Sequence, residues 1–102
     1  MTQDEARAKL EEYRVLIDDV DRRIVELLNE RTRTVEEIGR VKRSAALPIY
    51  EPKRETAVFE NVTAANHGPL TPDALKRIFE RIIDEMRGVQ RTQMEAAAEE
   101  NS

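Results

Sequence analysis

The chain lacks cysteine altogether and is poor in glycine, proline and aromatic residues. Its 102 residues include no cysteine, three glycines and four prolines, and only 4% of them are aromatic. Without cysteine, a disulfide framework and thiolate chemistry are both excluded. Charged residues make up 37% of the sequence, a composition typical of long solvated helices rather than of a sheet. We therefore expect an all-α protein with a single domain.

Long apolar runs and an excess of positive charge are also absent. No apolar segment approaches the roughly 20 residues that a membrane-spanning helix needs. The first residues, MTQDEARAKLEEYR, lack the apolar core of a signal peptide. The formal net charge of −4 gives no sign of a nucleic-acid-binding surface. We expect a cytoplasmic protein that binds neither membrane nor nucleic acid.

The first half of the sequence carries one apolar stripe with a step of three or four residues, which predicts a helix from Ala6 to Lys42. Such a helix would be about 55 Å long, whereas a compact domain of this size has a radius of gyration of about 13 Å. The stripe therefore needs a second chain to cover it. Its positions are Leu10, Tyr13, Ile17, Val20, Ile24, Leu27, Arg31, Val35, Ile38 and Lys42.

Two shorter helices are predicted after this one. Pro52 suits the first turn of the second helix, and Thr71 followed by Pro72 is a signal for the start of the third. Three helices with two short loops, one helix being far too long for a monomer, predict an intertwined homodimer that forms a six-helix bundle. We place the domain at residues 5–94 and expect residues 95–102 to be a disordered tail.

Three strong hydrogen-bond donors fall on these apolar faces. Arg31 and Lys42 are eleven residues apart, which is three helical turns, so they share one face. Gln90 interrupts the stripe of the third helix. Each residue alone has an ordinary explanation: a salt bridge to a glutamate for Arg31, the helix dipole for Lys42 and an exposed position for Gln90. Together they indicate a binding site for a small anion inside the helical assembly.

The ordered set of motifs resembles the all-helical class of chorismate mutase. The segments LIDDVDRRIVELLNERTRTVEEIGRVK, PIYEPKRE and IFERIIDEMRGVQ carry the resemblance, which covers roughly residues 7–93. The segments YEPKRE and NHGPL are similar to mutase domains associated with the first synthase of the shikimate pathway. The resemblance implies an isomerase of aromatic amino acid biosynthesis, which converts chorismate to prephenate by a [3,3] Claisen rearrangement without a cofactor.

The resemblance also implies roles for individual residues. Lys42 and Gln90 would donate hydrogen bonds to the ether oxygen of the substrate. Glu55 would accept a hydrogen bond from the ring hydroxyl. Met86 stands where a serine can contact a carboxylate, so that contact is not expected here. His67 receives no role, and no metal site is visible. The substrate-binding residues are expected to be Arg14 from the partner chain, Arg31, Lys42, Glu51, Arg54, Glu55 and Gln90.

The spacing of the two arginines supports a site shared between two chains. Arg14 and Arg31 would lie roughly 25 Å apart along one helix, so they cannot both bind one small molecule from the same chain.

Three alternative functions remain open. An isochorismate-pyruvate lyase has the same fold and much of the cationic site. A non-catalytic helical dimer could serve as an interaction or regulatory module. The domain could also be weakly active alone and need a shikimate-pathway synthase as its partner.

Overall fold

The computed structural model describes residues 1–100, which form three helices and no strand. They are α1 (Gln3–Ser44), α2 (Pro52–Ala65) and α3 (Pro72–Glu100). The all-α prediction is therefore confirmed. The chain divides into two units, Met1–Arg33 and Thr34–Ser102, so α1 contributes to both. Within the described part, no helix combines the length and the apolar character that crossing a bilayer requires.

The first unit is the N-terminal three quarters of α1. Thr2 caps the N-terminus of the helix, because its hydroxyl oxygen accepts a hydrogen bond from the backbone N–H of Glu5 at 3.1 Å. Its exposed surface carries ion pairs between residues one turn apart, such as Arg7–Asp4 and Arg23–Asp19. Its large apolar side chains are nevertheless exposed: Leu10, Tyr13, Val15, Leu16, Ile17, Val20, Ile24, Val25 and Leu27.

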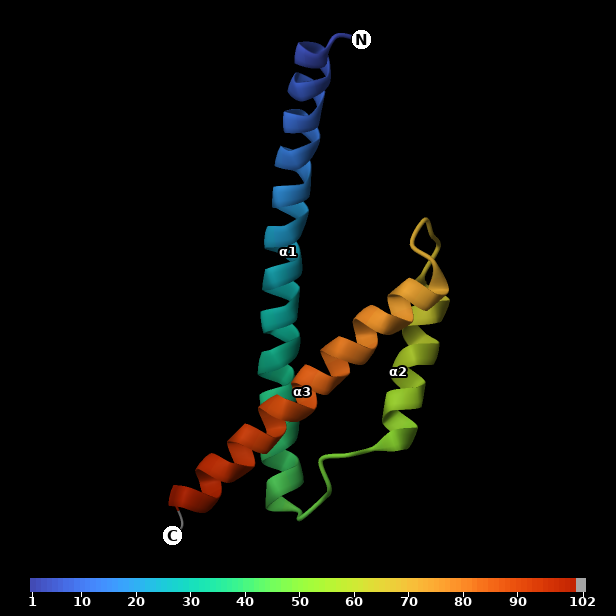
Figure 1. The fold of residues 1–102 in the computed structure, drawn as a ribbon. Coiled ribbons are helices and arrows are strands. Elements are labelled where there is room, and N and C mark those ends of the chain that lie inside the picture. Colours follow the sequence, from blue (N-terminus) through green and yellow to red (C-terminus); the bar gives the residue numbers. More distant parts are fainter. Residues whose placement is uncertain (101–102) are drawn as a thin grey trace. The chain divides into compact units, whose positions relative to one another are not determined.

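The second unit contains the end of α1 together with α2 and α3. In Figure 1, α3 turns back after the loop at residues 66–71, and its first turns lie beside the end of α2. Thr71 caps α3 by accepting from the backbone N–H of Ala74 at 3.2 Å, and Pro72 is its first residue, as the sequence predicts. The buried apolar side chains of the described residues all belong to this unit: Val35, Val58, Ile83, Met86 and Ala97.

The last turn of α1 is closed by two backbone hydrogen bonds. The N–H of Leu47 donates to the carbonyl of Lys42 at 2.7 Å, and the N–H of Ala46 donates to that of Arg43 at 3.3 Å. This pair of bonds is a Schellman motif, in which the residue just past the helix adopts the left-handed conformation. Ala46 does so here, with φ of 55°. The motif ends α1 at Ser44, two residues after Lys42, and turns the chain toward Ile49.

The C-terminal end of α3 lies beyond the predicted domain boundary at residue 94. The helix continues to Glu100, six residues into the segment expected to be a tail. The sequence EAAAEE consists of strong helix formers, which accounts for the helical conformation of residues 95–100. Residues 101 and 102 of the predicted tail lie outside the described residues.

Candidate functional site

Lys42 is a buried cation in the second unit, and its ammonium has three acceptors. Only 8% of the residue is exposed. Its Nζ donates to the carbonyl oxygen of Ile49 at 2.9 Å and to Gln90 Oε1 at 3.3 Å, and it lies 3.3 Å from Glu51 Oε1. An ammonium has three protons to donate, so these contacts satisfy it. The buried charge is stabilised by one carboxylate and two neutral oxygens.

Gln90 comes from α3 and meets Lys42 although 48 residues separate them in the sequence. The residue is 7% exposed. Because an ammonium can only donate, the atom of Gln90 that faces Lys42 must be the amide oxygen. The amide nitrogen is then left to donate elsewhere. Two of the donors that the sequence placed on apolar faces are thus adjacent, buried and fixed in orientation.

Close approach of α1 to α3 near Gly39 helps to bring this pair together. A Cβ atom added at Gly39 would lie 2.5 Å from Gln93 Oε1 and 3.5 Å from Gln90 Cγ. Gln93 Nε2 also donates to the backbone carbonyl of Glu36 at 3.2 Å. The absence of a large side chain at position 39 therefore lets α3 lie against the last turns of α1.

The acidic residues of the candidate site lie at the start of α2. Glu51 is half-exposed and pairs with Lys42. Glu55, in the first turn of α2, has a side chain that is 22% exposed and lies 3.3 Å from Arg87 Nε through its Oε2. Arg54 lies between them in the sequence and is exposed. The structure therefore brings together Lys42, Gln90 and Glu51, and places Glu55 against an arginine that the sequence analysis did not single out.

Arg14 and Arg31 belong to the first unit. Arg14 is exposed and forms an ion pair with Glu11 at 3.0 Å, one turn earlier in the helix. Such an exposed pair contributes little to stability, so Arg14 can exchange it for another partner. Arg31 is half-buried. Both arginines lie on α1, seventeen residues apart, which corresponds to roughly 25 Å along one helix.

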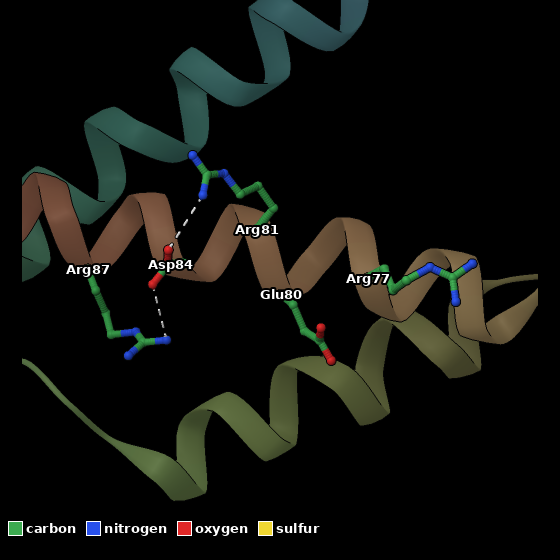
Figure 2. Close-up of a pocket in the computed structure, with 5 residues that line it drawn as sticks. All are labelled: Arg77, Glu80, Arg81, Asp84 and Arg87. Atoms are coloured by element: carbon green, nitrogen blue, oxygen red, sulfur yellow. Dashed lines mark ion pairs between the residues drawn. The ribbon is translucent and has the colours of Figure 1, made fainter.

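A shallow hollow of about 400 Å³ lies along α3 and is not lined by any of the predicted site residues. Its lining is charged and comes from Arg77, Glu80, Arg81, Asp84 and Arg87. Figure 2 shows these side chains on α3, with Arg81 and Arg87 paired to Asp84. Arg87 reaches from this hollow toward α2. It is the residue through which the hollow adjoins the candidate site.

Comparison with known proteins agrees with this arrangement of helices. The family model for chorismate mutase type II matches residues 13–91. The chain belongs to the type II chorismate mutase family. The match spans most of α1, all of α2 and α3 as far as the residue after Gln90, so every predicted site residue lies within it.

Two solved chorismate mutases have the same fold. The Form II structure of chorismate mutase from Thermus thermophilus is 35% identical, with a TM-score of 0.81 over 83% of this chain and 97% of that one. The structure of chorismate mutase from Helicobacter pylori in complex with prephenate is 25% identical, with a TM-score of 0.79 over 86% of this chain and 96% of that one.

A curated relative carries a second activity in its name. The bifunctional chorismate mutase/prephenate dehydratase of Aquifex aeolicus is 40% identical over 79 residues, which are 74% of this chain and 22% of that protein. The chain spans about a fifth of the length of the first such bifunctional relatives. The similarity therefore concerns the mutase part of those proteins.

Proposed function

We propose that the chain is a chorismate mutase, which rearranges chorismate to prephenate in the biosynthesis of phenylalanine and tyrosine. The observation that carries the proposal is the buried Lys42–Gln90 pair, held at 3.3 Å between the last turn of α1 and the middle of α3, in a chain of the type II chorismate mutase family. The H. pylori relative binds prephenate, the product of this reaction. Membership of the family makes the same product the one to test here.

The reaction needs no nucleophile, no proton relay and no cofactor. The enzyme must hold a dianion in a compact conformation and stabilise the negative charge that grows on the ether oxygen as the bond breaks. Holding the reactive conformer lowers the entropic part of the barrier. A preorganised donor at the developing charge is typically worth about 3–4 kcal/mol. Lys42 Nζ and Gln90 Nε2 are proposed as these two donors.

The contacts of Lys42 indicate how it becomes available to the substrate. All three of its protons have an acceptor in the chain, so one contact must yield when the ether oxygen arrives. The contact with Glu51 is the least costly to break, because 43% of the Glu51 side chain is exposed and water can solvate the freed carboxylate. Glu51 would then turn toward the substrate hydroxyl, while the Ile49 carbonyl and Gln90 keep Lys42 in place.

The carboxylates of the substrate would be bound by arginines, whose planar forks match them. Arg31 is proposed to act in the site of its own chain and Arg14 in the site of the partner. Arg54 is proposed to support the acidic cluster from the start of α2, and Glu55 to accept the ring hydroxyl. Because one helix holds Arg14 and Arg31 roughly 25 Å apart, both arginines can reach one substrate only in a dimer of antiparallel chains.

The exposed apolar seam of the first unit supports the homodimer. Leu10, Ile17, Val20, Ile24 and Leu27 are each more than 40% exposed. Contiguous exposed apolar surface on this scale marks an interaction surface. A second copy of the same helix would cover this apolar surface with the same kind of side chain.

The bifunctional relative named above carries a dehydratase rather than a synthase. A synthase partner for this chain remains a prediction.

The proposal is tested by incubating the purified chain with chorismate and, separately, with isochorismate. Loss of chorismate with formation of prephenate, identified by mass and by its acid-catalysed conversion to phenylpyruvate, is the expected result. Release of pyruvate from isochorismate at a higher kcat/KM would instead identify a lyase. Conversion of neither substrate by a folded dimer would leave two alternatives, the non-catalytic module and a domain that needs a synthase partner for activity.

A further inference from the structure

Arg87 occupies a position between three elements that the proposed chemistry does not explain. It lies on α3, one turn before Gln90, and its side chain is 35% exposed. Its Nε is 3.3 Å from Glu55 Oε2 on α2, its Nη2 is 3.7 Å from Asp84 Oδ1, and its guanidinium carbon is 5.7 Å from the centre of the Tyr50 ring. Figure 2 shows the side chain extending from α3 toward α2.

The contact between Arg87 and Glu55 is not a fully formed structural salt bridge. Among the described residues, Arg87 Nε is one of two buried side-chain polar atoms without a hydrogen-bond partner. It lies at ion-pair distance from Glu55 but outside hydrogen-bond geometry. Buried donors are nearly always satisfied in native proteins. A small rotation of the Glu55 carboxylate would satisfy this one, so the geometry is suited to tightening when a ligand orders Glu55.

We infer that Arg87 is a positioning residue for Glu55, fixing its carboxylate so that it can accept the ring hydroxyl of the substrate. The contact with Arg87 uses Oε2 and leaves Oε1 for the substrate. The ring of Tyr50 beneath the guanidinium and the carboxylate of Asp84 beside it hold Arg87 in this orientation. The inference rests on the proposed function, since it assigns Arg87 to the same site.

The position of Arg87 also explains how the Glu55 carboxylate can lie beside a dianionic substrate. Lys42 is expected to release Glu51 when the substrate binds, whereas Arg87 keeps its contact with Glu55. Glu55 therefore retains a cation of its own, which comes from a different helix. Without Arg87, the negative charge of Glu55 would repel the dianionic substrate. The Glu55 side chain would also no longer be held in one orientation.

A double-mutant cycle tests the inference on the full chain with chorismate. We expect Arg87→Gln to lower kcat/KM by about tenfold, and by less than about twofold when Glu55→Gln is already present, because the residue through which Arg87 acts is then altered. Arg87→Lys keeps the charge but not the fork and should restore part of the loss. Arg81→Gln is the matched control: this α3 arginine pairs with Asp84 and Glu85, and its loss should leave activity unchanged.

A second readout uses an analogue of chorismate in which hydrogen replaces the ring hydroxyl. Arg87→Gln should slow the rearrangement of this analogue by less than the roughly tenfold loss expected on chorismate, since the analogue has no hydroxyl to donate to Glu55. Equal losses from Arg87→Gln in the wild-type and Glu55→Gln backgrounds, or equal losses on chorismate and the analogue, would overturn the inference. If Arg87→Gln does not fold, Arg87→Lys carries both comparisons. An inactive wild-type chain would instead refute the proposed function itself, and the inference with it.

Discussion

Replacing Gln90 with glutamate should make the reaction depend on pH in a way that the wild-type reaction does not. Gln90 is a neutral donor, and its amide oxygen is held by Lys42. In Gln90→Glu, one carboxyl oxygen takes over the contact with Lys42, and the other replaces the amide nitrogen that is proposed to face the ether oxygen. An ionised carboxylate can only accept, so the variant donates only when it is protonated.

The size of the effect follows from two quantities. A glutamate with an unperturbed pKa of about 4.3 is protonated in roughly 0.02% of molecules at pH 8. Loss of one donor at a developing oxyanion costs about 10²–10³ in rate. We therefore expect kcat/KM of Gln90→Glu to be about 10²–10³ lower than wild type at pH 8. The rate should stay near this value until the protonated fraction exceeds about 10⁻³–10⁻², which happens between about pH 7.3 and pH 6.3. Below that pH it should rise by up to about tenfold for each unit of pH decrease until protonation of the carboxyl is complete.

The assay is the initial rate of chorismate loss between pH 4.5 and 8.5. Burial penalises the charged form of the new carboxyl while Lys42 favours it, so the pH at which the rate levels off reports the balance of these two effects. Gln90→Met is the control, because it removes the donor without adding a titratable group and should be slow at every pH. Full activity of Gln90→Glu at pH 8 would refute the assignment of Gln90 as the ether-oxygen donor.

Three further predictions concern assembly and stability. The exposed seam of α1 predicts an obligate dimer, so sedimentation equilibrium should give two chains per particle and Tm should rise with protein concentration; a folded monomer at micromolar concentration would contradict this. Ala46→Gly should raise the free energy of unfolding by about 0.5–1 kcal/mol in urea titrations, because glycine adopts the left-handed conformation without strain. Gly39→Leu should lower it by about 1–3 kcal/mol, whereas Gly39→Ala should be nearly neutral, because only the flexible end of Gln93 must move.

The helices were predictable from the sequence because apolar periodicity and start signals are local. The stripe from Leu10 to Lys42 predicted α1, and Thr71 with Pro72 predicted the start of α3. The end of α1 was harder to predict from the sequence, because Ala46 adopts a left-handed conformation that alanine does not favour. Hydrogen bonds to the carbonyls of Lys42 and Arg43 impose that conformation.

Only part of the candidate site could be read in the same way. Lys42 and Gln90 were noticeable because strong donors rarely occupy apolar faces. Their mutual contact, and the use of the Ile49 carbonyl as a partner for Lys42, depend on the path of the loop after α1, which periodicity does not encode. Arg87 was missed because it lies off the apolar stripe. In the sequence, Arg87 cannot be distinguished from Arg81, which is also an arginine of α3. Among the described residues, Arg81 pairs only with acidic residues one turn along its own helix.

The most direct test of a reaction site shared between two chains is complementation between inactive variants. We expect Arg14→Ala and Lys42→Ala each to be nearly inactive as homodimers with wild-type circular dichroism. When the two are unfolded together and refolded, about half of the dimers should be heterodimers, each with one intact site. The mixture should recover roughly a quarter of wild-type activity toward chorismate if the sites are independent. Folded parents, demonstrated chain exchange and no return of activity would contradict the account, because Arg14 would then not act in the partner's site.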